Sequence, residues 1–494
     1  MPKKKENLSP EERLIKAVIP KEEEPYTLPD NWVWTRLGDI TTVLSGGTPS
    51  TSKEEYYKDG NISWITPKDL SNYKEKYIYK GARNITEEGL RKSSAVLLPK
   101  DSVLMSSRAP IGYVVICKKE VSTNQGFKNF APSISYIPEY LYHYLKKSKN
   151  YLESIATGTT FKELSGEKAK KIIFPLSPLE EQKRIVEKLD SLFEKTEKIK
   201  EIIEEIKEKT SSRREAVLSK AFTGELTEKW RAENKTENAK ELLLKINEEK
   251  LKNNPKAKIK DVSEMLVNED EIPYKIPENW VWTKLENLVS ILGDGIHGTP
   301  IYDDNGEYYF INGNNLNNGK IIIKENTKKV NETEYLKYKK NLTDRTIFVS
   351  INGTLGNLAF YNNEKIILGK SACYFNLSHQ INKKFIYYLL KTDYFIKYAI
   401  KSSTGSTIKN LSLKAMKNVG IVLPSLEEQK EIVRILDKVF EEENKISELI
   451  SLEEKVEILE KTILDKAFRG ELGTGNSNDE PALGLLKRVL EENK

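Results

Sequence analysis

The sequence is poor in the residues that build covalent or metal-centred sites. Its 494 residues contain two cysteines, Cys117 and Cys373, and three histidines, His143, His297 and His379. Two isolated cysteines argue against a disulfide framework and against a cysteine-based zinc site. The histidines show neither H-x-x-x-H nor H-E-x-x-H spacing, which excludes a histidine-rich metal site.

Long apolar segments are also missing. No apolar run approaches the roughly 18 residues that a membrane-spanning helix needs. The opening residues, MPKKKENLSPEERL, are charged and lack the apolar core of a signal peptide. Hydrophobic residues still make up 38% of the chain, which is enough to fill ordinary cores. We therefore expect a folded cytoplasmic protein, and its length predicts two or three domains.

Motifs of catalysis are scarce as well. The segment LGKS at 368–371 ends like a phosphate-binding loop, but Glu364 stands where the first glycine is required, so the cradle cannot form. No N-P-P-Y or N-P-P-F segment occurs, which argues against an adenine-amino methyltransferase. Scattered combinations of acidic residues and lysines occur, but at 31% charged residues they are expected by chance and do not indicate a nuclease. The sequence predicts a binding protein with no catalytic residues and no cofactor of its own.

What the chain does have is a long internal repeat. Four phrases recur in the same order, at offsets of 248, 247, 247 and 246 residues. They are LPDNWVWTRLGDI (28–40) and IPENWVWTKLENL (276–288), TGTTFKELS (157–165) and TGSTIKNLS (404–412), PLEEQ (178–182) and SLEEQ (425–429), and LSKAFTGEL (218–226) and LDKAFRGEL (464–472). A period of this length indicates a duplicated unit of domain size, because solenoid repeats are 20–50 residues long.

Between the repeated phrases the two halves diverge. SWITPKDL (63–70) corresponds only faintly to FINGNNL (310–316), and VLMSSRAPIG (103–112) to IFVSINGTLG (347–356). Their shared pattern is a short β-branched or aromatic strand followed by a polar, glycine-bearing loop. Each half therefore has a constant frame and its own variable loops.

The repeat predicts a regular order of segments. Residues 28–178 and 276–425 read as α+β modules, and 179–222 and 426–470 as long helices. The first helix contains no glycine or proline, and Ile185, Leu189, Leu192, Ile199 and Ile203 lie on one heptad seam. We expect the two helices to pair antiparallel, as a pseudo-two-fold axis would arrange them. Three segments complete the chain: an extension (1–27), a helix and linker (223–275), and a tail (471–494) whose final helix matches NAKELLLKINEEK in the first half.

Positive charge is concentrated in the modules. Residues 28–178 contain 22 Lys and Arg against 15 Asp and Glu, and residues 276–425 contain 19 against 12, so each module carries +7. The first long helix has 11 of each sign, and residues 426–470 have 8 against 13. A polyanion would be attracted to the modules rather than to the helices. Two equally basic modules on one frame favour nucleic acid, with DNA half-sites at fixed spacing as the natural target.

Together these phrases resemble the specificity subunit of type I restriction–modification enzymes. The resemblance runs from about residue 25 to 472 and occurs twice in the same order. SGGTPS (45–50) and GDGIHGTP (293–300) resemble that family's early glycine loops, and SSRAPIG (106–112) its mid-domain loop. The second half has SINGTLG (350–356) at that place, where the arginine is absent, so its role cannot be carried over.

The resemblance implies both a fold and a function. The fold is α+β, with two duplicated α/β target recognition domains separated by two long antiparallel coiled-coil-like helices. Each domain would read one half of a split, asymmetric double-stranded DNA sequence. Two copies of a DNA adenine methyltransferase subunit and restriction/translocase subunits would bind the chain. S-adenosylmethionine, ATP and Mg²⁺ would be used by those partners, which would also flip the target adenine.

Polar side chains at loop tips of a basic module can reach base edges, where Arg pairs with guanine and Asn or Gln with adenine. The predicted DNA-contacting residues of the variable loops are Ser45, Thr48, Arg108, Asn124, Gln125 and Lys128 in the first module, and His297, Asn312, Asn314, Asn315, Asn352 and Lys370 in the second. The competing interpretation of each is a solvated turn residue, because Asn, Ser and Gly favour turns.

The shared loop calls for a different prediction, because constant residues cannot discriminate between two half-sites. Contact with phosphates or with partner subunits suits them better, and a helix N-cap or turn is the alternative. These residues are Thr157, Thr159, Thr160, Lys162, Thr404, Ser406, Thr407 and Lys409. The paired tryptophans, Trp32 with Trp34 and Trp280 with Trp282, are predicted to pack in the core or against a long helix rather than on bases.

Two other classes stay open from the residues alone. The chain could belong to an enzyme, as the recognition half of a nuclease–methyltransferase or as a nuclease, although the missing motifs count against it. It could also be a coiled-coil scaffold that binds no DNA, which the two basic modules disfavour. Binding to a random duplex library separates the three.

Overall fold

The computed structural model describes residues 9–108, 110–158, 162–253, 260–450 and 452–492, with the backbone alone described for 444–450. The chain forms two compact units. Unit 1 comprises residues 1–203 and 451–494, and unit 2 comprises residues 204–450. Each unit therefore holds one globular module, the first half of the long helix after that module, and the second half of the other long helix.

Unit 1 contains three sheets. A two-stranded frame pairs β1 with β10 antiparallel, a central sheet has the order β2-β9-β6-β7-β4, and a small sheet has the order β5-β3-β8. The strands are β1 (Val33–Arg36), β2 (Val43–Ser45), β3 (Ile62–Ile65), β4 (Tyr77–Ile78), β5 (Arg83–Ile85), β6 (Val103–Ser107), β7 (Ile111–Cys117), β8 (Ser122–Thr123), β9 (Phe127–Phe130) and β10 (Ile173–Leu176).

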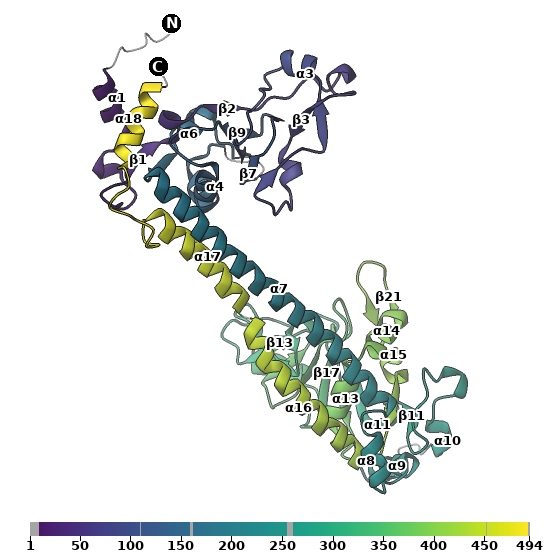
Figure 1. Cartoon of the computed structure of the whole chain (residues 1–494). Helices are drawn as coiled ribbons and strands as arrows, with labels where there is room; N and C mark the ends of the chain where they lie inside the picture. The colour runs from purple at the N-terminus through teal and green to yellow at the C-terminus, as the bar shows by residue number, and fades with distance from the viewer. Residues whose placement is uncertain (1–8, 109, 159–161, 254–259, 451, 493–494) are drawn as a thin grey trace. The chain divides into compact units, whose positions relative to one another are not determined.

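Helices surround these sheets, as Figure 1 shows for the purple and blue part of the chain. They are α1 (Pro10–Ala17), α2 (Leu37–Ile40), α3 (Glu87–Arg91), α4 (Pro138–Lys147), α5 (Lys149–Ile155), α6 (Gly166–Lys170), α17 (Leu452–Phe468) and α18 (Ala482–Glu492), with 3-10 turns η1 (Lys21–Glu23), η2 (Glu54–Tyr56) and η3 (Pro67–Leu70). The long helix α7 (Leu179–Thr223) contributes residues 179–203 to this unit.

Unit 2 repeats the three sheets. Its frame pairs β11 with β23, its central sheet has the order β12-β20-β17-β18, and its small sheet has the order β16-β13-β19. Two short hairpins, β14-β15 and β21-β22, are added. The strands are β11 (Val281–Lys284), β12 (Val289–Asp294), β13 (Tyr308–Ile311), β14 (Leu316–Asn317), β15 (Lys320–Ile321), β16 (Lys329–Val330), β17 (Thr346–Ser350), β18 (Leu358–Phe360), β19 (Ile366–Leu368), β20 (Ala372–Leu377), β21 (Ser403–Thr404), β22 (Asn410–Leu411) and β23 (Gly420–Leu423).

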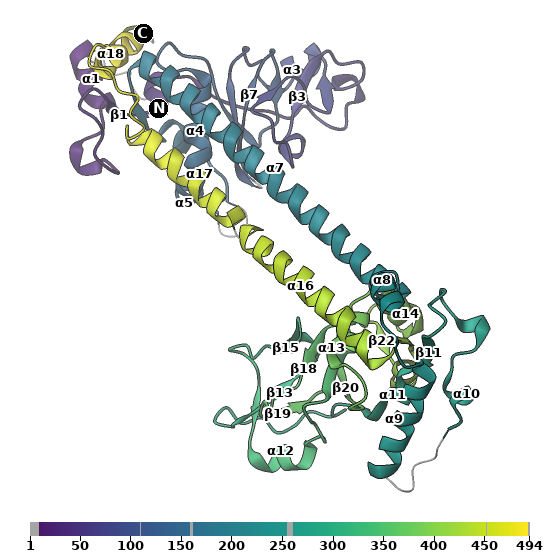
Figure 2. The same cartoon turned by 60° about the horizontal axis from the view of Figure 1, so that its bottom comes forward.

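The helices of unit 2 are seen from a second side in Figure 2. They are α8 (Glu228–Glu233), α9 (Ala239–Asn253), α10 (Val262–Met265), α11 (Leu285–Leu288), α12 (Glu332–Tyr338), α13 (Lys383–Leu389), α14 (Asp393–Ser402), α15 (Leu413–Asn418) and α16 (Leu426–Ile450), with 3-10 turns η4 (Glu269–Glu271) and η5 (Gly313–Asn315). The predicted α+β fold with two duplicated modules and long helices is confirmed. Among the described residues, no helix is both long enough and apolar enough to span a bilayer.

The two modules share one topology despite their divergent loops. Each frame ladder is in the same register, with Val33 opposite Leu176 and Val281 opposite Leu423. In both small sheets the middle strand pairs antiparallel on one side and parallel on the other. The repeated phrases thus encode the same scaffold, because they supply its frame strands and the starts of its long helices.

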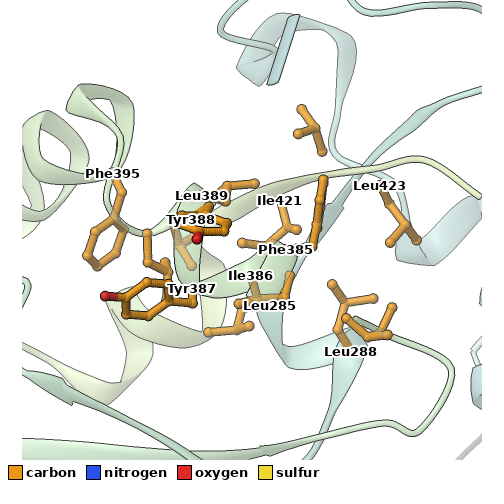
Figure 3. Packing of buried hydrophobic residues seen from close by; sticks show 14 of the residues in the cluster. Leu285, Leu288, Phe385, Ile386, Tyr387, Tyr388, Leu389, Phe395, Ile421 and Leu423 are labelled. Carbon is orange, nitrogen blue, oxygen red and sulfur yellow. The ribbon is translucent and has the colours of Figure 1, made fainter. Parts of the chain in front are cut away.

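Each unit has its own apolar core. In unit 2, Phe385, Ile386 and Leu389 of α13 are buried in one apolar cluster with Leu285 of α11 and Ile421 of β23, and Figure 3 shows these side chains together. In unit 1 the corresponding core gathers apolar side chains from α2, α4, β6 and β10 together with those of α7, α17 and α18. Burial of this kind stabilises each unit by roughly 25 cal/mol per Å² of apolar surface removed from water.

The tryptophans lie in these cores, which confirms the prediction for them. The exposed fractions of Trp32, Trp34, Trp280 and Trp282 are 6% or less. Trp34 and Trp282 each meet a tyrosine ring edge-on with 4.9 Å between ring centroids, and each donates its indole N–H to that tyrosine's carbonyl oxygen. Their identity in both halves therefore reflects packing and not base recognition.

The long helices pair antiparallel within each unit. In unit 1, Thr196 and Lys200 of α7 bond to Glu460 of α17, at 2.6 and 2.8 Å. In unit 2, Arg214 of α7 bonds to Glu443 of α16 at 3.2 Å. Helix α16 ends at Ile450 and α17 begins at Leu452, close to where one residue is lost between the copies.

The heptad seam is only partly buried. Ile185, Leu189, Thr196 and Ile203 are buried as expected. Ile199, assigned to the same seam, is 41% exposed, so the prediction was wrong there. A single helix partner covers a narrower stripe of α7 than the two heptad positions span. In the second long helix, the side chains of residues 444–450 are not described, so its seam is followed outside that segment only.

Candidate nucleic-acid interface

Each module is joined to its long helix through a buried glutamate at the start of that helix. Glu181, in the phrase PLEEQ, accepts a hydrogen bond from the Trp32 indole at 2.9 Å and from the Thr474 hydroxyl at 3.3 Å. Glu428, in SLEEQ, accepts from Trp280 at 2.8 Å and from Thr227 at 2.8 Å. Both carboxylates are at most 1% exposed. The glutamate thus joins the tryptophan phrase and its own helix to a threonine that follows the other long helix.

The glutamine that follows fixes the same junction. Gln182 accepts from the backbone N–H of Ile137 and donates to the carbonyls of Ser135 and Ser177. Gln429 accepts from the backbone N–H of Asn382 and donates to Pro424. These buried hydrogen bonds satisfy backbone groups at the start of α4 or α13. These hydrogen bonds hold the module against its helix. The variable loops belong to other parts of the module.

The early glycine loops dock backbone against backbone. The N–H of Gly47 donates to the Thr123 carbonyl, and the N–H of Ile296 donates to the Leu368 carbonyl. A Cβ on Gly46 would lie 1.9 Å from the Asn124 oxygen, and one on Gly295 would lie 2.3 Å from Gly369. Glycine is required here because no side chain fits this approach. Ser45 is exposed beside Gly46, and Thr48 contacts the Gln125 side chain.

Residues 293–298, GDGIHG, also have the G-x-G-x-x-G spacing of dinucleotide-binding loops. In that motif a helix follows the loop, and its N-terminus holds the pyrophosphate. Residues 295–307 are all described and contain no helix. Of its three glycines, Gly295 makes the close backbone contact with Gly369, Gly293 lies against the Tyr374 ring, and an added Cβ on Gly298 would meet nothing within 4 Å.

Other predicted residues of the first module differ in exposure. Gln125 is exposed, whereas Asn124 is half-buried and its side chain accepts from the Gly126 N–H at 2.9 Å. Arg108 is half-buried, and its guanidinium makes no hydrogen bond or ion pair within the described part of the chain. A cation without an internal partner at the surface of a basic module is available to an anionic or acceptor-rich ligand.

Lys128 does not lie at a loop tip, contrary to expectation. It belongs to β9, is 5% exposed, and its ammonium donates to the Phe127 carbonyl at 3.3 Å. Burial lowers the pKa of Lys128 below its ordinary value, nearby Glu163 opposes that shift, and Arg108 adds to it. Sequence spacing alone could not reveal this, because Lys128 lies within the sheet between strands β2 and β6, opposite Ser45 and Met105, which are far away in the sequence.

In the second module two asparagines support a turn. Asn315 is 6% exposed; it accepts from the Asn312 N–H at 3.0 Å and donates to the Ile322 carbonyl at 2.9 Å. Asn312 accepts from the Ser371 hydroxyl at 3.0 Å. Asn315 therefore holds η5 and is not an exposed tip, whereas the neighbouring Asn314 is exposed.

Two other residues of this module are exposed as expected. Lys370 is exposed, and His297 contacts Asp294 at 2.7 Å with its own side chain 74% exposed. Asn352 is half-buried and donates to the Asn410 side chain at 3.3 Å.

The shared loop is a β-hairpin in both modules. Thr157 and Glu163 exchange backbone hydrogen bonds of 3.0 and 2.8 Å, and Thr404 pairs with Asn410. Gly405 has φ +90° and Gly158 has φ +115°, a left-handed backbone that explains the T-G pair. Lys162, Ser406, Thr407 and Lys409 are exposed, while Thr159 and Thr160 lie outside the described residues.

Two residues in this region were not among those predicted from the sequence. Glu163 forms a backbone bridge with Arg108, and Asn410 forms one with Asn352. The available signal was the divergence of the shared phrase itself, FKELS in one copy and IKNLS in the other. Within the described residues, no group of three or more His, Cys, Asp and Glu side chains is arranged to hold a metal ion.

The fold and these loop sets define a two-module binding protein in which one repeated frame carries two different polar surfaces. The model of the type I restriction modification DNA specificity domain matches residues 29–208 and 277–454. The chain belongs to this family. It is a DNA-recognition subunit of a type I restriction–modification system and not itself an enzyme.

Individual relatives agree with this assignment. The type I restriction enzyme MjaIX specificity subunit of Methanocaldococcus jannaschii is 32% identical over 469 residues, covering 92% of this chain and 96% of the relative. The EcoBI specificity subunit of Escherichia coli is 24% identical, covering 90% and 86%.

Solved structures show the same fold. A chain from a structural study of complex assembly and conformational transition of the type I R-M system aligns with TM-score 0.65 at 19% identity, covering 91% of this chain and all of that one. The HsdS subunit from Thermoanaerobacter tengcongensis aligns with TM-score 0.52 at 19% identity, with the same coverage.

Proposed function

We propose that this chain reads a bipartite, asymmetric DNA target, with one half of the target read by each module. The observation that carries the proposal is the contrast between frame and loops. The buried glutamate, the glutamine and the tryptophans are the same in both modules, whereas the loop residues beside them differ. Two different reading surfaces on one scaffold suit two different half-sites.

Within this proposal the residues have separate tasks. Arg108, Gln125, His297, Asn314, Asn352 and Lys370, which are exposed or half-buried on loops or at strand ends, contact base edges or nearby phosphates, with Ser45, Thr48, Asn124 and Asn312 beside them. The exposed hairpin residues Thr157, Lys162, Thr404, Ser406, Thr407 and Lys409, and with them Thr159 and Thr160, contact phosphates or partner subunits. Lys128 and Asn315 are buried and act indirectly. They hold the strands and turns that carry the base-contacting residues.

The chain also assembles the complex. We propose that two methyltransferase subunits bind it, one for each half of the repeat, and that restriction subunits join that core in the cytoplasm. S-adenosylmethionine, ATP and Mg²⁺ belong to those partners, and no residue of this chain is assigned to them. The duplication supports a stoichiometry of two, because each repeated frame offers an equivalent surface.

A random duplex library tests this function. The full chain, alone and with candidate methyltransferase subunits, is incubated with the library, and the bound duplexes are sequenced. We expect two short, different half-sites separated by a gap of fixed length. A continuous motif, the absence of any motif in both preparations, or DNA cleavage by the chain alone would contradict the proposal.

A further inference from the structure

The shared hairpin is not constant at every position. Its two copies, TGTTFKELS and TGSTIKNLS, differ in charge at one place, where Glu163 in the first corresponds to Asn410 in the second. The remaining differences exchange a threonine for a serine and a phenylalanine for an isoleucine. A change of charge inside a framework motif indicates a local task that differs between the modules.

The residue opposite that position changes with it. Arg108 bridges to Glu163, and Asn352 bridges to Asn410, both antiparallel. Adjoining backbone hydrogen bonds fix the register, from Leu164 N–H to Ser107 at 2.9 Å and from Leu411 N–H to Ile351 at 2.8 Å. Directly opposed residues of an antiparallel pair have side chains on the same face. The modules therefore carry an Arg–Glu pair and an Asn–Asn pair at one equivalent place.

A second row of residues on the neighbouring strands also differs. In module 1 Lys128 lies opposite Ser45 and Met105 in the sheet, and in module 2 Cys373 lies opposite Asp294 and Val349. Lys128 and Cys373 are thus equivalent, as are Ser45 and Asp294. Module 1 places a cation in this row, whereas module 2 places a carboxylate, which contacts His297 at 2.7 Å.

The polar side chains of the two modules at these equivalent positions match different base edges. In the major groove guanine presents two acceptors, O6 and N7, whereas adenine presents the N7 acceptor and the N6 amino donor. Arg108, unpaired among the described residues and close to the Lys128 cation, offers donors only. Asn352 offers both an amide donor and a carbonyl acceptor, and its N–H group already points to Asn410 at 3.3 Å.

We infer that Arg108 and Asn352 are the equivalent specificity residues of the two modules, reading guanine and adenine respectively, and that Glu163 and Asn410 position them. The inference rests on the proposed function and makes it more specific. The bridge between strand end and hairpin limits where each reading side chain reaches. Glu163 lies opposite Arg108 in this backbone bridge, so its carboxylate is on the same face as the guanidinium, although no ion pair joins the two among the described residues.

Exchanging the pairs tests this assignment. The full chain carrying R108N and E163N, and a second chain carrying N352R and N410E, are compared with wild type by selection from a randomised duplex library in the presence of methyltransferase subunits. In the first variant one guanine of one half-site should change to adenine. In the second, one adenine of the other half-site should change to guanine. The untouched half-site and the gap must stay as in wild type, and selection of the remaining bases of the altered half-site shows that the exchanged module is folded.

Single substitutions separate reading from positioning. E163Q should lower the preference for guanine over adenine at that one position about tenfold, since a bidentate contact supplies about that factor or more. The matched control K162A, an exposed lysine of the same hairpin, should weaken all duplexes equally and leave the base preference intact. Binding is measured by fluorescence anisotropy on duplexes that differ at that position only.

The outcomes separate a failure of the proposed function from a failure of this inference alone. If wild type selects no bipartite motif, the proposed function fails and the inference falls with it. If wild type selects the motif but the exchanged pairs leave every base preference unchanged, the inference alone is overturned. The same holds if E163Q weakens all duplexes equally, because Glu163 would then be only structural.

Discussion

At the scale of single residues, the buried glutamates of the two LEEQ phrases show how a repeat specifies its own junctions. Glu181 and Glu428 each accept from a tryptophan indole and from a threonine that follows the other long helix. Glu428 also pairs with Arg231, whereas the carboxylate of Glu181 lacks a cation within 4 Å among the described residues. A buried carboxylate is tolerated only where donors surround it, so the tryptophan phrase and the LEEQ phrase recur together, each with a threonine beyond the other long helix.

Glycines after the long helices belong to this scale too. Gly470 has φ +73°, and a Cβ there would lie 2.3 Å from Pro29 Cγ; Gly473 has φ +68° with nothing within 4 Å of an added Cβ. We expect G470A to lower the free energy of unfolding by about 2–3 kcal/mol, and the control G473A by about 1 kcal/mol, because only the first adds a clash to the backbone strain. Urea unfolding of the full chain measures both; equal losses would contradict the packing role of Gly470.

A buried histidine gives unit 1 a pH dependence. Burial lowers the pKa of His143 from 6.5, and the nearby Lys76 ammonium lowers it further, although the contact with Asp190 opposes this. Below pH 6.5 the unfolded chain binds a proton at His143 that the folded chain does not. Stability should therefore fall with decreasing pH, by at most about 1.4 kcal/mol per pH unit.

The measurement is the melting temperature between pH 7.5 and 5.5. H143Q should reduce the loss seen in the wild type, because the substituted side chain does not titrate in this window. H379Q, which removes an exposed histidine of unit 2, serves as the control and should melt like wild type. The pKa of Asp190 is also lowered, although its own burial opposes this, because His143 and Lys76 donate to it and their charges favour the carboxylate. Its contribution is lost only as the pH falls below 3.8, outside the window. An unchanged slope in H143Q would contradict the assignment.

At the scale of elements, helices α18 and α9 are equivalent parts of the two units. The N–H of Ala482 donates to Asn31, and the N–H of Ala239 donates to Asn279, each just before the tryptophan strand. The predicted match between the final helix and the helix after the first repeat is thereby confirmed. Unit 1 takes this helix from the C-terminal tail, whereas unit 2 takes it from the chain between its own α7 and β11.

The equivalence predicts reciprocal effects of two leucine substitutions. Leu486 of α18 and Leu243 of α9 are both fully buried, in the cores of unit 1 and unit 2. L486A should destabilise unit 1 alone and L243A unit 2 alone, each by about 2–5 kcal/mol. Hydrogen exchange followed by mass spectrometry locates the loss. Faster exchange in the wrong unit, or in both, would contradict the division of the chain.

At the scale of the whole molecule, the duplication separates the choice of bases from the spacing of the half-sites. If each module reads one half-site, replacing residues 28–178 with the module of another family member should change one half of the target and leave the gap unchanged. Inserting one heptad in each long helix should change the gap alone. Library selection checks both variants. A change of both halves after a single replacement would show that the modules do not read independently.

The sequence by itself determined the duplication, the α+β character of the modules, the long helix from residue 179 and the family. These features follow from local periodicity and from repeated phrases, which can be recognised without knowing which distant residues are in contact. It also indicated that the tryptophans belong to the frame, because both copies keep them.

Only the tertiary structure decided which polar residues are free and which are enclosed. Lys128 and Asn315 look like loop residues in sequence, yet Lys128 lies within the sheet between β2 and β6, and Asn315 is enclosed by its own turn. The pairing of Arg108 with Glu163 joins residues 55 positions apart, and no local pattern encodes such a contact. The exposure of Ile199 was missed for a related reason, since a heptad pattern marks an apolar stripe but not how much of it one partner helix covers. Side-chain burial depends on what the folded chain places opposite a residue, and that is fixed only when the sheets and helices pack.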